Sequence, residues 1–368
     1  MNPAAIVARG ISKRFGGVQA LEGVTFGLGP GEVHALLGAN GAGKSTLIGI
    51  LSGAIAPDRG SVEVAGQLLP PGDIVAAKRA GVMVVHQELM LFPDLTVEDN
   101  VAASKLPLNR ALLLDRRQLR ARAASVLTSL GLPVAPSRKV GDLSLAQQQI
   151  VEIGRAVFGG GRVLILDEPT SALSQPETLR LLNVIHALAQ QGVAVVFVSH
   201  RLDEAIQIAE RITVLRDGMV QGTWGASETD LARVTRAMVG EFVATRRSAA
   251  VSTGDVVLSV QNVRGAEVGP VTFDLHEGEI LGLIGLEGSG TDVLLRMLGG
   301  AVPCKGEILL QGEQLRLRHP ADALRAGLVY MPPDRKREGL WLERSPIWNI
   351  ATAMIRRTAP LGWPGSSA

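Results

Sequence analysis

Short apolar runs of strand length alternate along the chain with segments that have the spacing of amphipathic helices. Residues 33–37 (Val-His-Ala-Leu-Leu) and 193–198 (Val-Ala-Val-Val-Phe-Val) are typical of buried strands. Residues 44–51 predict a helix directly after the first run, and apolar side chains at helical spacing in residues 179–188 predict another before the second. Because strand and helix alternate, we expect an α/β fold.

The apolar composition does not indicate a membrane-spanning protein. Mean hydropathy is +0.23, but the clearest apolar segments have strand length, whereas a membrane-spanning helix needs about 18 consecutive apolar residues. The N-terminus has no basic region followed by an apolar stretch, so we expect no signal peptide. We therefore expect a cytoplasmic chain whose association with a membrane depends on a partner.

Charge and aromatic content argue against a nucleic-acid partner. Lys plus Arg is 37 and Asp plus Glu is 35, which gives a net charge of only +2. Aromatic residues make up 3% of the chain, too few for base-stacking platforms. The single cysteine, Cys304, excludes an internal disulfide and a cysteine-based metal site. A length of 368 residues predicts about two domains.

A phosphate-binding loop follows the first predicted strand. Residues 38–45, Gly-Ala-Asn-Gly-Ala-Gly-Lys-Ser, match the pattern G-x-x-x-x-G-K-[ST] between a strand and a helix. The glycines let backbone N–H groups converge on anionic oxygens, Lys44 would reach the β- and γ-phosphates, and Ser45 would ligate Mg²⁺. The loop predicts binding of a nucleoside triphosphate. The candidate binding residues are Gly38, Asn40, Gly41, Gly43, Lys44, Ser45 and Thr46.

Acidic residues end a second predicted strand. Residues 162–166 are mainly apolar and are followed by Asp167 and Glu168. Asp167 would hold Mg²⁺, and Glu168 would polarise an attacking water. The next strand ends at Ser199 and His200, and because parallel strands gather ligands at their carboxyl edge, we expect His200 to contact the γ-phosphate.

The chain contains an internal duplication. A shift of 247 positions places Val24-Thr-Phe on Val271-Thr-Phe, and it superposes glycines needed for turns. We expect a first domain at residues 1–241, a linker at 242–255 and a second copy of the fold at 256–368. Gly38, Gly41 and Gly43 of the phosphate loop align with Gly285, Gly288 and Gly290.

The second copy is degenerate. Thr291 and Asp292 replace Lys44 and Ser45, which removes the cation and adds a carboxylate that phosphates would repel. We therefore expect the second loop to keep its fold but to bind nucleotide weakly or without hydrolysis. The first copy spans about 240 residues and about 113 follow Asp255, so we expect a truncated second copy.

Residues near position 144 indicate a family. Leu143-Ser144-Leu-Ala-Gln147 opens a predicted helix and resembles the signature of ATP-binding-cassette (ABC) ATPases, with Ala146 where glycine is common. The chain is most similar to the duplicated ATP-binding subunits of bacterial importers of ribose, galactose and xylose. The supporting segments are His86-Gln-Glu-Leu89, residues 95–100, residues 147–152 and Asp334-Arg-Lys-Arg-Glu-Gly339.

The resemblance implies a fold and further roles. It implies a P-loop NTPase of the ABC ATPase type, a mixed sheet core with a helical subdomain at about 91–141 that receives the permease, followed by a partial second copy. It implies that Phe15 stacks on adenine and that Gln87 contacts Mg²⁺. Ser144 and Gln147 would contact the γ-phosphate held by a second cassette. Pro333 stands at the glutamine position of the second copy and has no side-chain ligand.

The resemblance also implies a function. The expected activity is ATP hydrolysis with Mg²⁺ that powers monosaccharide uptake through a separate permease and a substrate-binding protein, at the cytoplasmic face of the membrane. The pairing stays open: two chains join through their first copies, or the chain is a truncated product with impaired transport. Two alternatives remain, a catalytically silent nucleotide-binding partner and a soluble ABC ATPase without a transport role.

Overall fold

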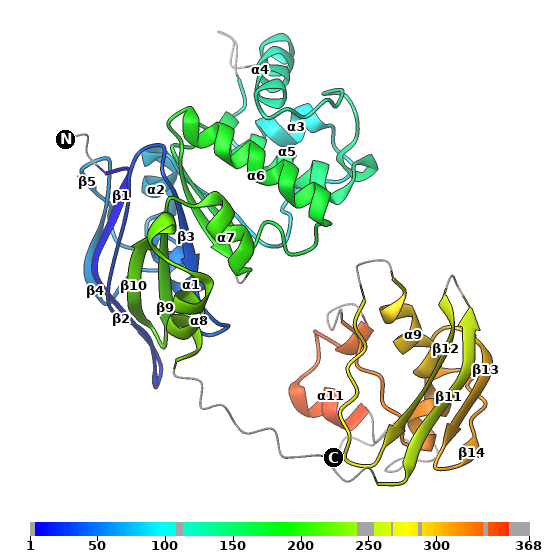
Figure 1. Cartoon of the computed structure of the whole chain (residues 1–368). Coiled ribbons are helices and arrows are strands. Elements are labelled where there is room, and N and C mark those ends of the chain that lie inside the picture. Colours follow the sequence, from blue (N-terminus) through cyan, green and yellow to red (C-terminus); the bar gives the residue numbers. More distant parts are fainter. Residues whose placement is uncertain are drawn as a thin grey trace. The chain divides into compact units, whose positions relative to one another are not determined.

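The computed structural model describes residues 4–107, 113–199, 201–240, 254–265, 268–285, 289–333 and 338–352. The chain divides into two compact units, residues 1–245 and 246–368, each with its own core (Figure 1). Only the last two positions of the predicted linker, 254 and 255, fall within the described residues. No helix in the described ranges has the length and apolar character needed to cross a membrane.

Two sheets form the frame of the first unit. A four-stranded antiparallel sheet has the order β2-β1-β4-β5, and a six-stranded sheet has the order β10-β9-β3-β8-β7-β6. All neighbouring strands of the larger sheet are parallel except β10, which is antiparallel to β9. The strands are β1 (Ile6–Phe15), β2 (Val18–Leu28), β3 (Val33–Leu37), β4 (Arg59–Val64), β5 (Gln67–Leu68), β6 (Val82–Val85), β7 (Val163–Asp167), β8 (Ala194–Ser199), β9 (Arg211–Arg216) and β10 (Met219–Gly225).

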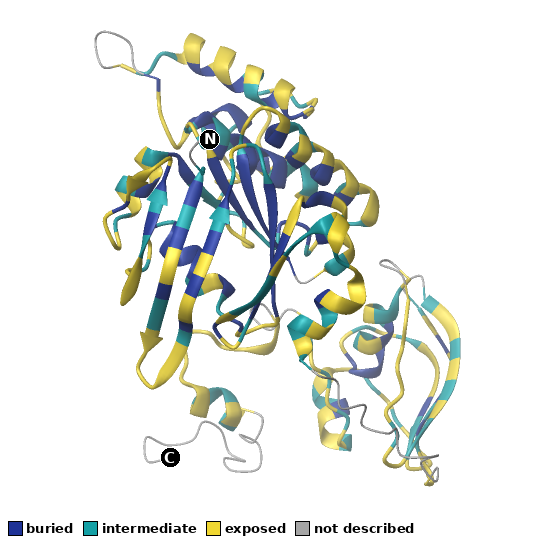
Figure 2. Cartoon of the chain, turned by 60° about the vertical axis from the view of Figure 1, so that its left-hand side comes forward, coloured by how far each residue is buried: buried dark blue, intermediate teal, exposed yellow. Residues whose placement is uncertain are grey.

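The central strands are buried on both faces. Every residue of β3 and β8 is buried, as the dark blue strands of Figure 2 show. Side chains of β3 alternate: Ala35 and Leu37 join one core cluster, while Leu36 joins the other. A parallel strand covered on both sides needs a nearly continuous apolar run, which is why residues 33–37 and 194–198 lack the alternation of a half-exposed strand.

Helices surround the larger sheet. α3, α4 and α5 pack against one another in the part of the unit drawn at the top of Figure 1. Thr96 and Asp115 cap α3 and α4 by accepting hydrogen bonds from backbone N–H groups, and both lie in the predicted helical subdomain. The helices are α1 (Lys44–Leu51), α2 (Ile74–Ala80), α3 (Val97–Ala102), α4 (Arg116–Ser129), α5 (Leu145–Phe158), α6 (Gln175–Gln190), α7 (Leu202–Ile208) and α8 (Leu231–Val239).

The second unit repeats part of this design. Its four-stranded sheet has the order β12-β11-β13-β14, which corresponds strand by strand to β2-β1-β4-β5. Gly290, in the left-handed conformation, precedes α9 as Gly43 precedes α1. The elements are β11 (Val256–Gly265), β12 (Val268–His276), α9 (Thr291–Leu298), β13 (Lys305–Leu310), β14 (Glu313–Gln314), α10 (Pro320–Ala326) and α11 (Pro346–Thr352).

The expectation that the loop region of the second copy keeps the fold is wrong at residues 280–284. This segment aligns with β3 but is not a strand, and Ile280 and Ile284 are 98% and 97% exposed. In the first unit, β3 is paired on one side by β8 and on the other by β9. The described part of the second unit contains no counterpart of either strand, so the backbone of 280–284 has no ladder to join.

Candidate functional site

The sheet topology brings the predicted phosphate loop and the acidic strand end to one edge. β8 lies between β3 and β7, with Leu37 opposite Ser199 and Asp167 opposite Val198. All three strands are parallel, so their carboxyl ends face the same way. β3 and β7 are two strand spacings apart, or about 10 Å. The loop after β3 and the acids after β7 therefore frame one site.

The loop backbone requires glycine at two positions for packing reasons. A Cβ atom at Gly38 would lie 2.4 Å from the carbonyl oxygen of Leu215, and one at Gly43 would lie 2.6 Å from that of Ala20. Gly43 also has a φ of 102°, and Gly41 has a φ of 83° with open space around it. The loop thus has a fixed path, which a phosphate-binding backbone needs.

Lys44 is folded over the start of this loop. Its Nζ donates hydrogen bonds to the carbonyl oxygens of Gly38 at 2.7 Å and Ala39 at 3.1 Å, and the residue is 8% exposed. Burial lowers the pKa of Lys44, while the charges of Glu168 and Asp167 act in the opposite direction. A buried ammonium that donates hydrogen bonds to two carbonyl oxygens and feels the charge of two acids is suited to pair with an anionic phosphate.

The acidic residues lie beside it. Asp167 is the last residue of β7, and burial, followed by the charge of Glu168, raises the pKa of Asp167. Glu168 has a φ of 48°, and its N–H donates to the carbonyl oxygen of Val198 at 2.9 Å, so the chain turns sharply after the strand. The side-chain amide of Gln87 donates to Oε2 of Glu168 at 3.1 Å.

The structure therefore gathers Lys44, Gln87, Asp167 and Glu168, which the sequence separates by up to 124 positions. Ser45 and Thr46 follow Lys44 in the first turn of α1, with Ser45 exposed. Asn40 is exposed in the loop itself.

His200 lies outside the described residues. Its neighbour Ser199 is 2% exposed at the end of β8, and the Ser199 hydroxyl accepts a hydrogen bond from the N–H of Arg201 at 2.9 Å. The strand that precedes His200 thus ends at the same edge as Asp167.

Phe15 ends β1 with its ring accessible. The residue is 48% exposed, and the Nζ atom of Lys13 lies 5.4 Å from the ring centroid. This exposure argues against a core phenylalanine and leaves a π face for a base.

Ser144 and Gln147 form the capping box at the start of α5. The Ser144 hydroxyl accepts from the Gln147 N–H at 3.3 Å, and the Gln147 side chain accepts from the Ser144 N–H at 3.1 Å. Both residues line a pocket of about 550 Å³ together with Leu130, Ile150 and Leu181. No hydrogen bond or ion pair of the described residues joins them to Lys44 or Glu168.

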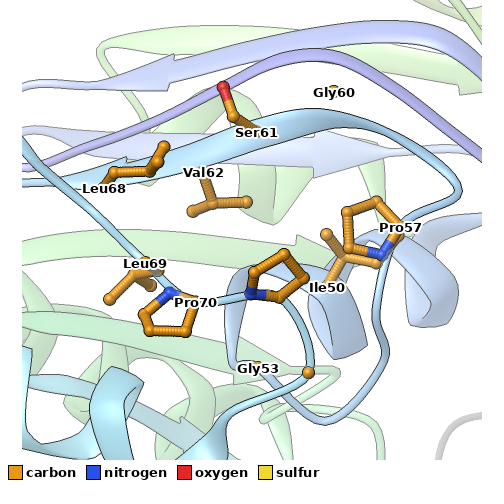
Figure 3. Close-up of a pocket in the computed structure, with 11 residues that line it drawn as sticks. Ile50, Gly53, Pro57, Gly60, Ser61, Val62, Leu68, Leu69 and Pro70 are labelled. Carbon is orange, nitrogen blue, oxygen red and sulfur yellow. The ribbon is translucent and has the colours of Figure 1, made fainter.

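A smaller pocket, of about 130 Å³, lies between α1 and the β4–β5 hairpin (Figure 3). Its lining is apolar apart from Ser61, and it includes Pro57, Pro70 and Pro71. Because the lining holds no charged side chain, this pocket supplies no acid, base or metal ligand.

The side chains at the site suit Mg²⁺ bound together with a triphosphate. Within the described ranges no group of three or more His, Cys, Asp or Glu residues could hold a metal by itself. Ser45, Gln87 and Asp167 offer a hydroxyl, an amide and a carboxylate oxygen, and Mg²⁺ prefers such oxygen ligands with the remainder supplied by phosphates and water.

The sequence reasoning assigned no role to two ionisable residues near the site, His86 and Glu152. Burial raises the pKa of both Asp167 and Glu152, and the charge of His86 acts against this rise at each, so the imidazole lies within electrostatic reach of both carboxylates. A single sequence gives little signal for Glu152, because a glutamate on a helix normally faces water.

Comparisons with known proteins find similar chains and a matching family model. The family model described as ABC transporter matches residues 21–171 and 268–343. A protein of Burkholderia cenocepacia strain HI2424, named for ribose, galactose and methyl galactoside import, is 43% identical over 354 residues, which are 95% of this chain and 69% of the relative. The ribose import ATP-binding protein RbsA of Chelativorans sp. strain BNC1 is 41% identical over 362 residues, 96% of this chain and 70% of the relative.

Solved structures of ABC cassettes share the fold. The ADP conformation of the cassette MJ1267 has a TM-score of 0.58 at 24% identity and covers 65% of this chain and 99% of that one. The dimeric post-hydrolysis state of the cassette MJ0796 with ADP and Pi has a TM-score of 0.52 at 27% identity, covering 60% and 98% of the two chains. The predicted α/β fold of the ABC ATPase type is thereby confirmed.

Proposed function

Because this chain belongs to the ABC transporter family, we propose that it is the ATP-hydrolysing subunit of an importer for a monosaccharide of the ribose or galactose kind. The observation that carries the proposal is the convergence of Lys44, Gln87, Asp167 and Glu168 at one sheet edge. A cation and two acids beside a glycine loop are the groups that phosphoryl transfer from ATP to water requires.

Each residue has a separate task in this proposal. Backbone N–H groups of residues 38–44 and the Lys44 ammonium hold the phosphates of ATP, and Thr46 extends this contact in α1. Ser45, Gln87 and Asp167 hold Mg²⁺, which supplies charge neutralisation for the transferred phosphoryl group.

The remaining residues act on water and on adenine. Glu168 orients and polarises the attacking water, and its hydrogen bond from Gln87 fixes the carboxylate. His200 contacts the γ-phosphate from the end of β8, and the accessible ring of Phe15 stacks on adenine.

The site is completed by a second cassette. Ser144 and Gln147 are exposed or half-buried at the N-terminus of α5, where they contact the γ-phosphate bound by the partner cassette. The partner is a second copy of this chain or a full-length subunit. With domain boundaries at 241 and 256, every residue that this chain contributes to a nucleotide site lies in its first domain.

The described part of the second unit lacks the groups that we assign to hydrolysis in the first. Thr291 and Asp292 stand at the Lys44 and Ser45 positions, and residues 280–284 form no strand to support a loop.

Partners connect hydrolysis to transport. The helical subdomain at residues 91–141 receives the permease at the cytoplasmic face of the membrane, and a substrate-binding protein delivers the sugar on the other side. Exposed apolar side chains in this segment, among them Phe92, Leu95 and Leu106, support a protein-binding surface there. Co-sedimentation with membranes distinguishes this role from that of a soluble ABC ATPase.

An ATPase assay on the purified chain tests the function. We expect phosphate release that rises more than linearly with protein concentration and is abolished by Glu168→Gln. A rate no higher than that of the Glu168→Gln variant at every concentration contradicts hydrolysis. ATP binding without turnover would instead assign the chain the role of a silent partner.

A further inference from the structure

An ion pair on α5 holds the backbone of Met90 through both of its polar groups. Oε2 of Glu152 accepts a hydrogen bond from the Met90 N–H at 2.9 Å. Nη1 of Arg155 donates to the Met90 carbonyl oxygen at 2.5 Å, and Nη2 of Arg155 donates to Oε1 of Glu152 at 2.6 Å. Three side-chain contacts thus close a ring around one peptide segment; we call Glu152 and Arg155 the Met90 clamp.

The carboxylate of the clamp is buried, and its guanidinium is partly exposed. Glu152 is 1% exposed, and the side chain of Arg155 is 20% exposed. Burial raises the pKa of Glu152, and Arg155 is the strongest influence that lowers it. Removing one partner of such a pair leaves an uncompensated buried charge, which is far more costly than losing an exposed ion pair.

The clamp joins two segments that carry proposed nucleotide contacts. Met90 lies three residues after Gln87, whose amide bonds to Glu168. On the other side, α5 starts from its cap Ser144 and reaches Glu152 after two turns, about 12 Å along the helix axis. A helix transmits displacement along its axis as a rigid body, whereas the segment from Gln87 to Met90 is not helical.

We propose that Glu152 and Arg155 are positioning residues that couple the Gln87 segment to the Ser144 end of α5. Under the proposed function, on which this inference rests, a shift of Gln87 at the ATP–Mg²⁺ site moves Met90, and the clamp carries the movement into α5. Ser144 and Gln87 then respond to bound nucleotide together rather than separately.

The first unit contains a second ion pair with a buried carboxylate, which does not join the Gln87 segment to α5 and so serves as a control. Arg120 donates from Nε and Nη2 to the two carboxylate oxygens of Glu98 at 2.9 and 3.0 Å, and Glu98 is 4% exposed. This pair links α4 to α3, and among the described residues neither side chain forms a hydrogen bond with the Gln87 segment or with α5. Glu98→Gln is therefore the control for losing a buried carboxylate in the same layer of helices.

Hydrogen–deuterium exchange on the full chain, with and without ATP and Mg²⁺, tests the coupling. In the wild type and in Glu98→Gln, ATP should slow exchange in both residues 87–92 and residues 144–150. In Glu152→Gln, ATP should still slow exchange near Lys44, but the effect at 144–150 should be lost. ATP-dependent protection of 144–150 that is equal in Glu152→Gln and Glu98→Gln, or absent in the wild type, would overturn the coupling.

Kinetics give a second readout. We expect Glu152→Gln to lower kcat about 10-fold while KM for ATP changes less than about twofold, since the substrate-binding loop is untouched. Arg155→Lys, which keeps the charge, should recover part of kcat, and Arg155→Met should not. If Glu152→Gln does not fold, the two Arg155 variants still test the coupling. Equal kcat values in Arg155→Lys and Arg155→Met would contradict it. Failure of the wild type to bind ATP would contradict the proposed function instead.

Discussion

The side-chain amide of Gln87 lies 3.1 Å from Oε2 of Glu168, although 81 residues separate the two positions. Gln87 follows β6 and Glu168 follows β7, which is the parallel neighbour of β6. The contact fixes the carboxylate that we assign to water activation and ties it to the segment that continues to Met90. The contact thus connects the proposed site of hydrolysis to the segment that α5 holds at Met90.

Lys44→Ala should weaken ATP binding about 100-fold, because it removes the buried cation of the loop. Titration with a fluorescent ATP analogue measures the affinity. The fold should persist, since Lys44 makes only two hydrogen bonds within its own loop. An unchanged affinity with an intact circular dichroism spectrum would contradict the assignment of the loop.

Glu168→Gln should bind ATP normally but hydrolyse it at least about 100-fold more slowly, the usual contribution of a general base. The glutamine oxygen can still accept the hydrogen bond from Gln87, so the local structure should remain. Single-turnover phosphate release measures the rate. Hydrolysis within a few-fold of the wild type would exclude Glu168 as the residue that activates water.

Asp167→Asn should stabilise the fold at neutral pH while abolishing Mg²⁺-dependent turnover. Burial, then Glu168, raises the pKa of Asp167 above that of the unfolded chain. The folded state therefore holds this proton more tightly, and the ionised carboxylate opposes folding as the pH rises through the folded pKa.

Thermal unfolding followed by circular dichroism at a series of pH values checks this sign. The gain in Tm for Asp167→Asn should be about 2 °C at pH 8 and should shrink as the pH falls toward the unfolded pKa of about 3.9. A gain that grows on acidification would mean that the pKa of Asp167 is lowered in the folded chain.

Phe15→Ala should weaken ATP binding about 10-fold, the range expected for loss of one aromatic–base stack. Phe15→Trp should keep the affinity, and Phe15→Leu should not, because stacking needs a π face. If Phe15→Leu binds as well as the wild type, the side chain acts by packing alone. The 48% exposure of Phe15 predicts little change in Tm for any of the three.

Gly38→Ala should destabilise the first unit by about 2 kcal/mol or more, because the new methyl group would lie 2.4 Å from the carbonyl oxygen of Leu215. Gly41→Ala meets open space and carries only the cost of a φ of 83°, about 1 kcal/mol. Equilibrium unfolding in urea separates the two. Equal losses would show that the loop moves away from β9 without cost.

Much of the site could be predicted from sequence because its residues belong to local patterns. Lys44 and Ser45 follow a glycine pattern, and Asp167 and Glu168 end an apolar run, so each pair is recognised without its neighbours. The start of α6 is another local feature: the N–H and the hydroxyl of Ser174 both donate hydrogen bonds to Oε2 of Glu177, three residues later. Such features depend on backbone geometry within a few residues.

Other features depend on contacts between distant segments. Nothing in the local sequence distinguishes Glu152 and Arg155 from an exposed i,i+3 pair, since their burial comes from the packing of α5 against the segment after β6. Residues 280–284 give the opposite case: their apolar run predicts a strand, but a strand also needs neighbours to accept its hydrogen bonds.

The sequence by itself determined the α/β class and the duplication, and it predicted the chemistry at positions 44, 167 and 168, because short-range spacing encodes turns, caps and strand ends. Only the tertiary structure decided that Gln87 reaches Glu168, that Met90 is held by α5, and that the second copy lacks a supported β3 counterpart. Those outcomes depend on which strands and helices become neighbours, and burial and pairing energies act only once the chain has folded.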